Sequence, residues 1–331
     1  MSLDIDRLAE GVLEGDRRAL ARAITLIESR RSDHRPQADA VLERLLPQAG
    51  KSVRIGITGV PGVGKSTFIE AFGMHLIKQG RKVAVLAVDP SSPKSGGSIL
   101  GDKTRMEELS REPNAFIRPS PSGGTLGGVA RRTREAMLIC EAAGFDTAIV
   151  ETVGVGQSET AVAEMVDMFL LLLAPGTGDE LQGIKKGIVE LADLIVVNKA
   201  DGDLIIAAER VARDYGNALH LLRPASHNWI PKVVTASSIG GTGVAAVWQE
   251  VLAFEAALQA SGEITHKRST QAESWMWSEI NENLIAEFRA SSAVQDLIGQ
   301  LDSKVTKGRI SPTAAARALI AAFRDRNTLN D

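Results

Sequence analysis

Residues 59–66 read Gly-Val-Pro-Gly-Val-Gly-Lys-Ser and match the pattern G-x-x-x-x-G-K-[ST] at every defined position. The β-branched run 53–58 precedes them and the helical pattern 67–72 follows, which is the strand–loop–helix setting that a phosphate-binding loop requires. Its glycines let backbone N–H groups converge on an anion, and the helix N-terminus adds partial positive charge. We therefore predict an α/β P-loop NTPase and disfavour a glycine-rich turn that matches by accident.

The polar side chains of this loop have predictable roles. We expect the Lys65 ammonium to reach the β- and γ-phosphates of a nucleoside triphosphate, and the Ser66 hydroxyl to ligate Mg²⁺. The other candidate nucleotide-binding positions in this segment are Gly59, Pro61, Gly62, Val63, Gly64 and Thr67.

Around the loop, apolar strand patterns alternate with helical ones. This alternation over residues 51–255 predicts a P-loop domain with a mostly parallel sheet that is flanked by helices. Residues 1–50 carry apolar residues at helical spacing, so we expect an N-terminal extension of three short amphipathic helices. The expected strands are 53–58, 82–88, 115–118, 146–151, 167–173, 193–198 and 231–235.

Residues 256–331 show no strand pattern, and we expect a C-terminal helical arm there. Bulky apolar residues recur in it at steps of three and four: Trp277, Ile280, Leu284 and Phe288. Such a stripe packs either on its own domain or on a second copy. The pair Trp275 and Trp277 favours the second interpretation, a homodimerisation arm, with one ring pointing toward a neighbour.

Charge and composition argue against several classes of protein. The net charge of −3 gives no sign of nucleic acid or an anionic membrane as partner. The apolar run 168–174 is too short to span a bilayer. Cys140 is the single cysteine and the five histidines are scattered, so neither a disulfide nor a metal site built from cysteine and histidine is indicated. The acidic start lacks a secretory apolar segment, and we expect a cytoplasmic protein.

A second motif indicates which nucleotide is bound. Asn198-Lys199-Ala200-Asp201 follows the apolar strand 193–198, at the edge where open α/β sheets bind ligands. The Asp201 carboxylate can accept from guanine N1–H and the exocyclic N2 amine, and adenine lacks both donors. Ser237 and Ser238 follow the last expected strand, in a loop suited to close over the base. A helix-capping loop is the alternative for this motif alone; combined with the phosphate loop, it predicts GTP and GDP as ligands.

Acidic residues between the two motifs are candidates for the magnesium site. Asp89 and Glu151 each end an expected strand, and Asp102 lies in a loop between them. Glu151 begins Glu-Thr-Val-Gly, which resembles the D-x-x-G element of GTPases, and Gly154 can present its N–H to the γ-phosphate. An aspartate at a strand end can instead cap a helix. The choice between Asp102 and Glu151 as metal ligand stays open, and we assign Lys65, Glu151 and Asp89 to catalysis.

The sequence does not identify a catalytic arginine. Arg105, Arg131, Arg132 and Arg134 are equivalent candidates, and Gln157 is separated from Gly154 rather than adjacent to it. We therefore expect slow basal hydrolysis of GTP, because a partner often supplies the transition-state charge, worth ~10³–10⁵ in rate.

Three long strings resemble the signatures of the MeaB/ArgK-type GTPases. They are residues 89–106, 151–159 and 178–186, and with the two motifs the resemblance covers roughly residues 10–320. It implies a SIMIBI-type G domain, related to the nickel-delivery GTPases, in a homodimer. It further implies a chaperone that gates adenosylcobalamin loading into methylmalonyl-CoA mutase and protects that mutase, or serves a neighbouring acyl-CoA mutase.

The resemblance also gives a meaning to three loops. Residues 89–106 would be switch I and residues 151–160 switch II. A further switch loop at residues 174–185 would relay the nucleotide state to the mutase or the sister subunit. Its polar residues would be Asp179, Gln182 and Lys185. A simple strand-to-helix turn capped by Asp179 is compatible with this role.

Three rival functions fit the sequence less well. A GTP-dependent metallochaperone or maturation factor for another client shares the nucleotide site, but nickel needs ligands that one cysteine and scattered histidines do not supply. A small-molecule kinase needs an acceptor pocket and a base that no motif marks. A ParA-like ATPase carries an extra lysine where this chain has Val60.

Overall fold

The computed structural model describes residues 4–29, 31–88, 106–119, 126–152, 158–176, 186–220 and 226–327. The expected switch and metal-site residues outside these ranges are Asp89, Asp102, Gly154, Asp179, Gln182 and Lys185. The chain divides into two compact units, Met1–Arg268 and Ser269–Asp331.

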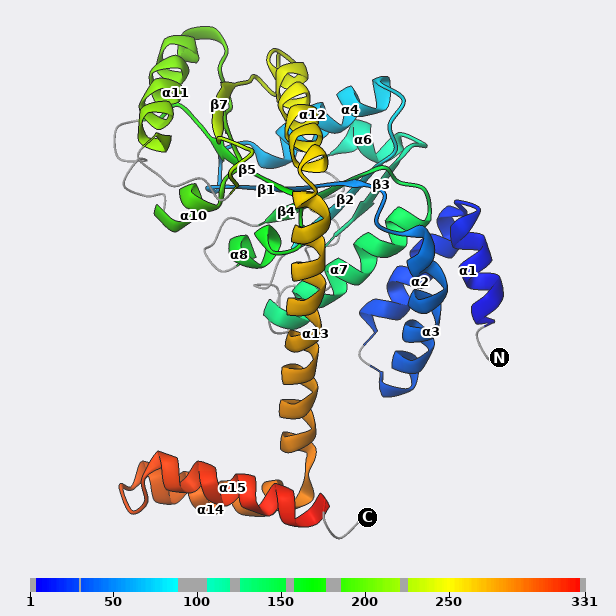
Figure 1. Ribbon diagram of the computed structural model, residues 1–331, viewed down its shortest axis with the longest axis vertical. Coiled ribbons are helices and arrows are strands. Elements are labelled where there is room, and N and C mark those ends of the chain that lie inside the picture. The colour runs from blue at the N-terminus through cyan, green and yellow to red at the C-terminus, as the bar shows by residue number, and fades with distance from the viewer. Residues whose placement is uncertain are drawn as a thin grey trace. The chain divides into compact units, whose positions relative to one another are not determined.

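A seven-stranded parallel sheet forms the centre of the first unit, in the order β3-β2-β4-β1-β5-β6-β7 (Figure 1). Buried parallel strands are continuous apolar runs, and each observed strand lies within one residue of its predicted bounds, which confirms the predicted sheet. The strands are β1 (Val53–Gly59), β2 (Val83–Val88), β3 (Ala115–Arg118), β4 (Thr147–Thr152), β5 (Met168–Leu173), β6 (Leu194–Val197) and β7 (Lys232–Thr235).

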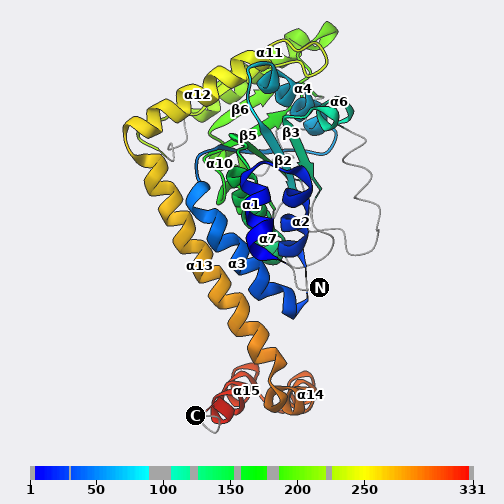
Figure 2. The same cartoon turned by 90° about the vertical axis from the view of Figure 1, so that its right-hand side faces the viewer.

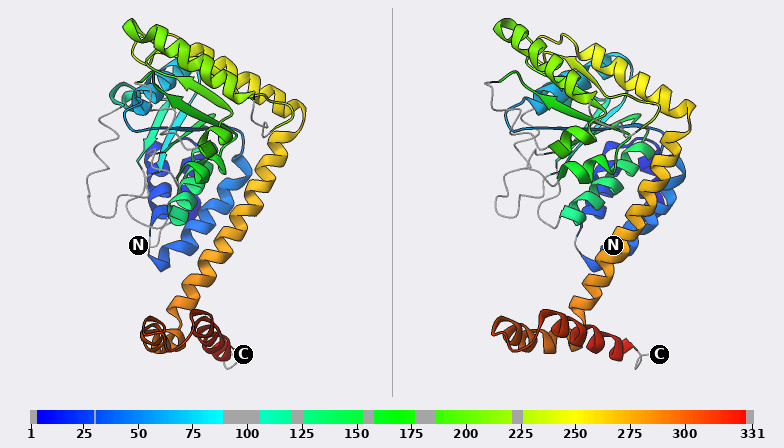
Figure 3. Two further views of the ribbon diagram at one scale, coloured as in Figure 1. Left: turned by 90° about the vertical axis from the view of Figure 1, so that its left-hand side faces the viewer. Right: turned by 60° about the vertical axis from the view of Figure 1, so that its left-hand side comes forward.

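Helices pack on both faces of this sheet. Alternate residues of β5 point to opposite sides, so that Leu170 and Leu172 join one apolar cluster and Leu171 and Leu173 join another. Figures 2 and 3 show α4 and α12 over one face and α7 over the other. The helices of the domain are α4 (Lys65–Lys78), α6 (Glu107–Arg111), α7 (Leu126–Ala142), α8 (Ser158–Ala163), α10 (Lys186–Leu191), α11 (Ile205–Leu219) and α12 (Val244–Ala260).

The N-terminal extension consists of the three predicted helices, α1 (Ile5–Leu13), α2 (Arg17–Glu28) and α3 (Arg35–Leu45). The side chains of Asp4 and Asp16 cap α1 and α2 by accepting backbone N–H bonds. The three helices pack on one another and on α7, within the first compact unit.

Helices also make up the described part of the second unit. Helix α13 (Glu263–Ala290) begins in the first unit and continues past its end, followed by α14 (Ser292–Thr306) and α15 (Pro312–Asn327). Within this unit the rings of Phe288 and Phe323 pack edge to face, with centroids 5.5 Å apart. The expected start of the arm at residue 256 falls inside α12, which ends at Ala260.

Several large apolar side chains of α13 are exposed to solvent. Trp277 is 56% exposed, and Met276, Leu284 and Ile285 are exposed to a similar degree.

Among the described residues, the helices that are long enough to cross a bilayer are not apolar enough to do so.

Candidate functional site

The phosphate loop connects the central strand β1 to α4, as predicted. Gly62 and Gly64 have φ angles of 84° and 90°, which lie in the left-handed region that favours glycine. At Gly59, a Cβ atom would lie 2.6 Å from the carbonyl oxygen of Leu172 in β5, so a side chain does not fit. These glycines allow the loop to turn sharply at the carboxyl edge of the sheet.

Lys65 lies in this loop with its ammonium turned toward the backbone. Its Nζ donates to the carbonyl of Gly59 at 2.6 Å and to that of Val60 at 3.3 Å. Burial lowers the pKa of Lys65, and the negative charges of Glu151 and Glu159 oppose this shift. The two carboxylates therefore help to keep positive charge where the phosphates are expected.

Ser66 and Glu151 are brought together as the magnesium hypothesis requires. The Ser66 hydroxyl donates to Oε1 of Glu151 at 3.2 Å, and Glu151 is 9% exposed at the end of β4. A hydrogen bond of 2.7 Å from Thr152 to Thr58 links the ends of β4 and β1 beside them. Hydroxyl and carboxylate oxygens are suitable Mg²⁺ ligands, so these two residues fit the ion. Within the described ranges, no cluster of three or more acidic, histidine or cysteine side chains is placed to bind a metal.

Asn198 connects the N-K-x-D motif of residues 198–201 to the phosphate loop. Its Nδ2 donates to the carbonyl of Val63 at 3.0 Å, and its Oδ1 accepts from the Ser238 hydroxyl at 2.6 Å and the Ser238 N–H at 3.2 Å. Asn198 is only 1% exposed. One amide thus holds two loops, using both its donor and its acceptor.

The remaining residues of the motif are held in the same way. Nζ of Lys199 donates to the carbonyl of Gly62 at 2.8 Å, and Lys199 adopts a φ of 58°, which is uncommon for a residue other than glycine. The Ser237 hydroxyl donates to Oδ2 of Asp201 and accepts from the Gly240 N–H at 2.9 Å. The Asp201 carboxylate is therefore oriented by the serine loop that follows β7.

The structure thus assembles the predicted phosphate-loop, guanine-reading and serine-loop residues at one edge of the sheet. Pro61 within the loop and Thr67 in the first turn of α4 are both exposed. The candidate arginines Arg131, Arg132 and Arg134 lie on α7, whereas Arg105 and Gln157 lie outside the described residues.

Glu159 belongs to this site, although it has no assigned role in the motifs. It is 2% exposed in the first turn of α8, and its charge acts on Lys65. In the sequence, the one indication of a role for Glu159 is its position at the end of the string 151–159. The sequence pattern does not predict that this carboxylate is buried.

Comparisons with known proteins show which proteins this chain resembles. A family model described as methylmalonyl Co-A mutase-associated GTPase MeaB matches residues 20–293. A putative GTPase of Caulobacter vibrioides is 59% identical over 322 residues, covering 97% of this chain and 98% of that protein. The mitochondrial methylmalonic aciduria type A homolog of Mus musculus is 51% identical over 333 residues, which cover 98% of this chain and 80% of that protein. A crystal structure described as an LAO/AO transport system kinase has a TM-score of 0.78 and is 40% identical in sequence. The match covers 98% of this chain and 99% of that chain.

Proposed function

Because this chain belongs to the MeaB family of methylmalonyl-CoA mutase-associated GTPases, we propose that it is a chaperone for that mutase. In this role it hydrolyses GTP, gates the loading of adenosylcobalamin into the mutase, and protects the loaded enzyme. The observation that carries the proposal is the family match across residues 20–293, joined to a phosphate loop and a guanine motif that contact each other through Asn198.

The chemistry is attack of water on the γ-phosphate. Lys65 supplies positive charge at the β- and γ-phosphates, and the loop N–H groups orient them. Ser66 and Glu151 would hold Mg²⁺, with Asp89 and Asp102 as further ligands, and the ion would neutralise phosphate charge when bound. Gly154 would donate its N–H to the γ-phosphate. The bond between the γ-phosphorus and the bridging oxygen breaks, GDP and inorganic phosphate leave, and the useful result is a change of loop conformation.

Guanine selection rests on Asp201. Its carboxylate, oriented by Ser237, accepts from N1–H and the N2 amine of the base. The aliphatic part of Lys199 and the backbone around Ser238 complete the base pocket. Adenine offers no donor at these positions, and it would leave the carboxylate unpaired at a cost of about 1–3 kcal/mol.

Two surfaces would transmit the nucleotide state. The exposed apolar residues of α13, including Trp277, form the contact with a second copy in a homodimer. Asp179, Gln182 and Lys185 form the switch loop that signals to the mutase or to the sister subunit. Coupling of this kind is typically worth about 1–3 kcal/mol and is reciprocal for binding.

The proposal is tested by the rate of phosphate release from GTP, with and without methylmalonyl-CoA mutase. We expect a slow basal rate that the mutase stimulates, and no turnover of ATP. An unchanged GTPase rate would leave the nucleotide assignment intact and contradict the choice of client, as for a maturation factor of another enzyme. The description of the solved relative names a kinase. Release of inorganic phosphate when no phosphate acceptor is added distinguishes GTP hydrolysis from kinase activity.

A further inference from the structure

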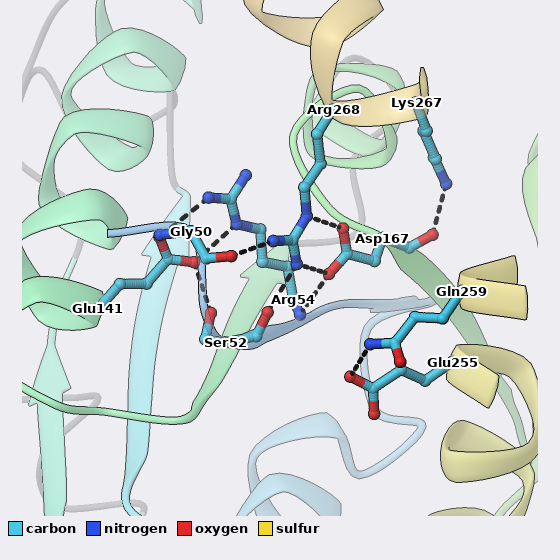
Figure 4. A network of polar contacts seen from close by, with 9 residues as sticks. All are labelled: Gly50, Ser52, Arg54, Glu141, Asp167, Glu255, Gln259, Lys267 and Arg268. Carbon is cyan, nitrogen blue, oxygen red and sulfur yellow. Dashed lines mark hydrogen bonds and ion pairs between the residues drawn. The ribbon is translucent and has the colours of Figure 1, made fainter. Parts of the chain in front are cut away.

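A buried network of polar contacts lies at the start of β1, at the end of the strand away from the phosphate loop (Figure 4). Asp167, which is 3% exposed, is at its centre. The Asp167 carboxylate accepts from Arg268 Nε at 2.8 Å, from Arg268 Nη2 at 2.6 Å and from the backbone N–H of Arg54 at 2.9 Å. We call this set of contacts, formed by Arg268, Asp167, Arg54 and Glu141, the Arg268 clasp.

Helix α13 contributes its second turn to the clasp. Arg268 also donates to the carbonyl of Gly50 at 2.5 Å and to that of Ser52 at 2.6 Å. The neighbouring Lys267 donates to the carbonyl of Asp167 at 2.5 Å. One guanidinium therefore binds the segment that leads into β1 and the turn that leads into β5.

The charges of the clasp balance each other inside the protein. Arg54 and Glu141 are each 4% exposed, and they form a forked ion pair with distances of 2.7 Å and 2.9 Å. Glu141 also accepts from the Ser52 hydroxyl at 2.5 Å and the Gly50 N–H at 2.6 Å. Each arginine thus has its own carboxylate, and removal of one member leaves a buried charge without its partner.

The clasp lies on a physical path from the nucleotide site. Arg54 is in β1, and the same strand ends at Gly59, where the phosphate loop begins. Asp167 follows α8, the helix that contains residues 158–160 of the expected switch II segment. Helix α8 packs directly on β1, because a Cβ atom at Gly56 would lie 2.9 Å from Val162 Cγ1. A shift of β1 would therefore move Arg54, and a shift of α8 would move Asp167, so either shift acts on a member of the clasp.

The first compact unit ends at Arg268, while α13 continues to Ala290. We propose that the Arg268 clasp couples the nucleotide site to the C-terminal helical unit, because it fixes the base of α13 to the strand that carries the phosphate loop. GTP and GDP bias the conformation of β1 and α8, and the clasp passes this bias to α13 as a difference in the stability of its first turns. The inference rests on nucleotide binding at the phosphate loop and is independent of which client the protein serves.

The test is amide hydrogen exchange in the first three turns of α13, in the full chain with Mg²⁺ and either GDP or guanosine 5′-(β,γ-imido)triphosphate. In the unsubstituted protein we expect exchange that differs between the two nucleotides. In Arg268→Gln we expect exchange at least about tenfold faster and equal for both nucleotides, with nucleotide affinity retained. The matched control is Arg289→Gln, which removes an exposed arginine near the other end of the same helix.

The outcomes separate coupling from simple support of the helix. Exchange that is faster in Arg268→Gln but keeps its nucleotide dependence would overturn the proposal, as would an unsubstituted protein with no nucleotide dependence. If Arg268→Gln does not fold, Arg268→Lys keeps the charge, loses the forked geometry and should reduce the nucleotide dependence partially. Tight nucleotide binding, measured in the same samples, distinguishes a failed clasp from a failed assignment of the nucleotide site.

Discussion

At the scale of single residues, the site depends on contacts that no motif contains. The spacing of Asn198, Lys199 and Asp201 predicted a guanine pocket, and the structure places these residues beside the phosphate loop. The hydrogen bond from Asn198 to Val63 joins residues far apart in the chain, so it arises only on folding. Glu159 was missed for the same reason, because its burial depends on how α8 packs on the sheet.

Asp201→Asn should weaken GTP binding selectively. The substitution replaces one acceptor oxygen with an NH₂ donor that opposes the guanine donors, so we expect affinity for GTP to fall by about 5–150-fold while the difference from ATP shrinks. Competition titrations with a fluorescent guanine nucleotide measure this. The control is Asp203→Asn, which replaces an exposed aspartate two residues away and should leave the affinity for GTP unchanged. Unaltered GTP selectivity in Asp201→Asn would rule out the base assignment.

Glu159→Gln should change how nucleotide binding depends on pH. Burial lowers the pKa of Lys65, and the negative charges of Glu151 and Glu159 oppose that shift. Loss of one negative charge lowers the Lys65 pKa further, so the weakening of GTP binding with rising pH should begin at a lower pH than in the unsubstituted protein. Affinity measured between pH 7 and 10 checks this. The exposed Glu164→Gln is the control, and coincident profiles would exclude an electrostatic role for Glu159.

At the scale of elements, the sheet could be predicted closely and the limits of the compact units could not. Buried parallel strands are continuous apolar runs between breakers, which explains why their bounds agree within one residue. The end of the first unit at Arg268 lies inside α13, where the helical pattern continues without a break. In the sequence, Arg268 resembles any other arginine of a helix, because its partners come from two segments that are distant in the chain.

Gly56→Ala should destabilise the contact between β1 and α8. An added methyl group would meet Phe169 at 2.8 Å, Val162 at 2.9 Å and Val166 at 3.0 Å. Overpacking of this kind costs roughly 1–3 kcal/mol of unfolding free energy. Urea denaturation measures the loss. Gly187→Ala in α10 is the matched control, since a Cβ there has no neighbour within 4 Å, and it should be neutral or stabilise by up to about 1 kcal/mol. Equal stability of the two variants would refute close packing at Gly56.

At the scale of the whole molecule, we propose that the C-terminal helical unit meets a second copy of this chain in a homodimer. Trp277→Asp places a charge in the exposed apolar face of α13 and should convert the dimer to monomer, because burying a lone carboxylate is unfavourable. Sedimentation velocity measures the change. The control is Ala286→Asp, which places the same charge at an exposed position on the opposite side of the same helix and should leave the dimer intact. A dimer that persists in Trp277→Asp would place the interface elsewhere.

We propose that the nucleotide bound to this protein controls the loading of adenosylcobalamin into the mutase. The most direct measurement follows the transfer of adenosylcobalamin to the cofactor-free mutase by absorbance, with this protein bound to GTP, to GDP or to the β,γ-imido analogue. We predict that the loading rate depends on which nucleotide is bound and that Lys65→Ala abolishes this dependence. Loading at the same rate with every nucleotide, and at that same rate without this protein, would contradict nucleotide-controlled loading.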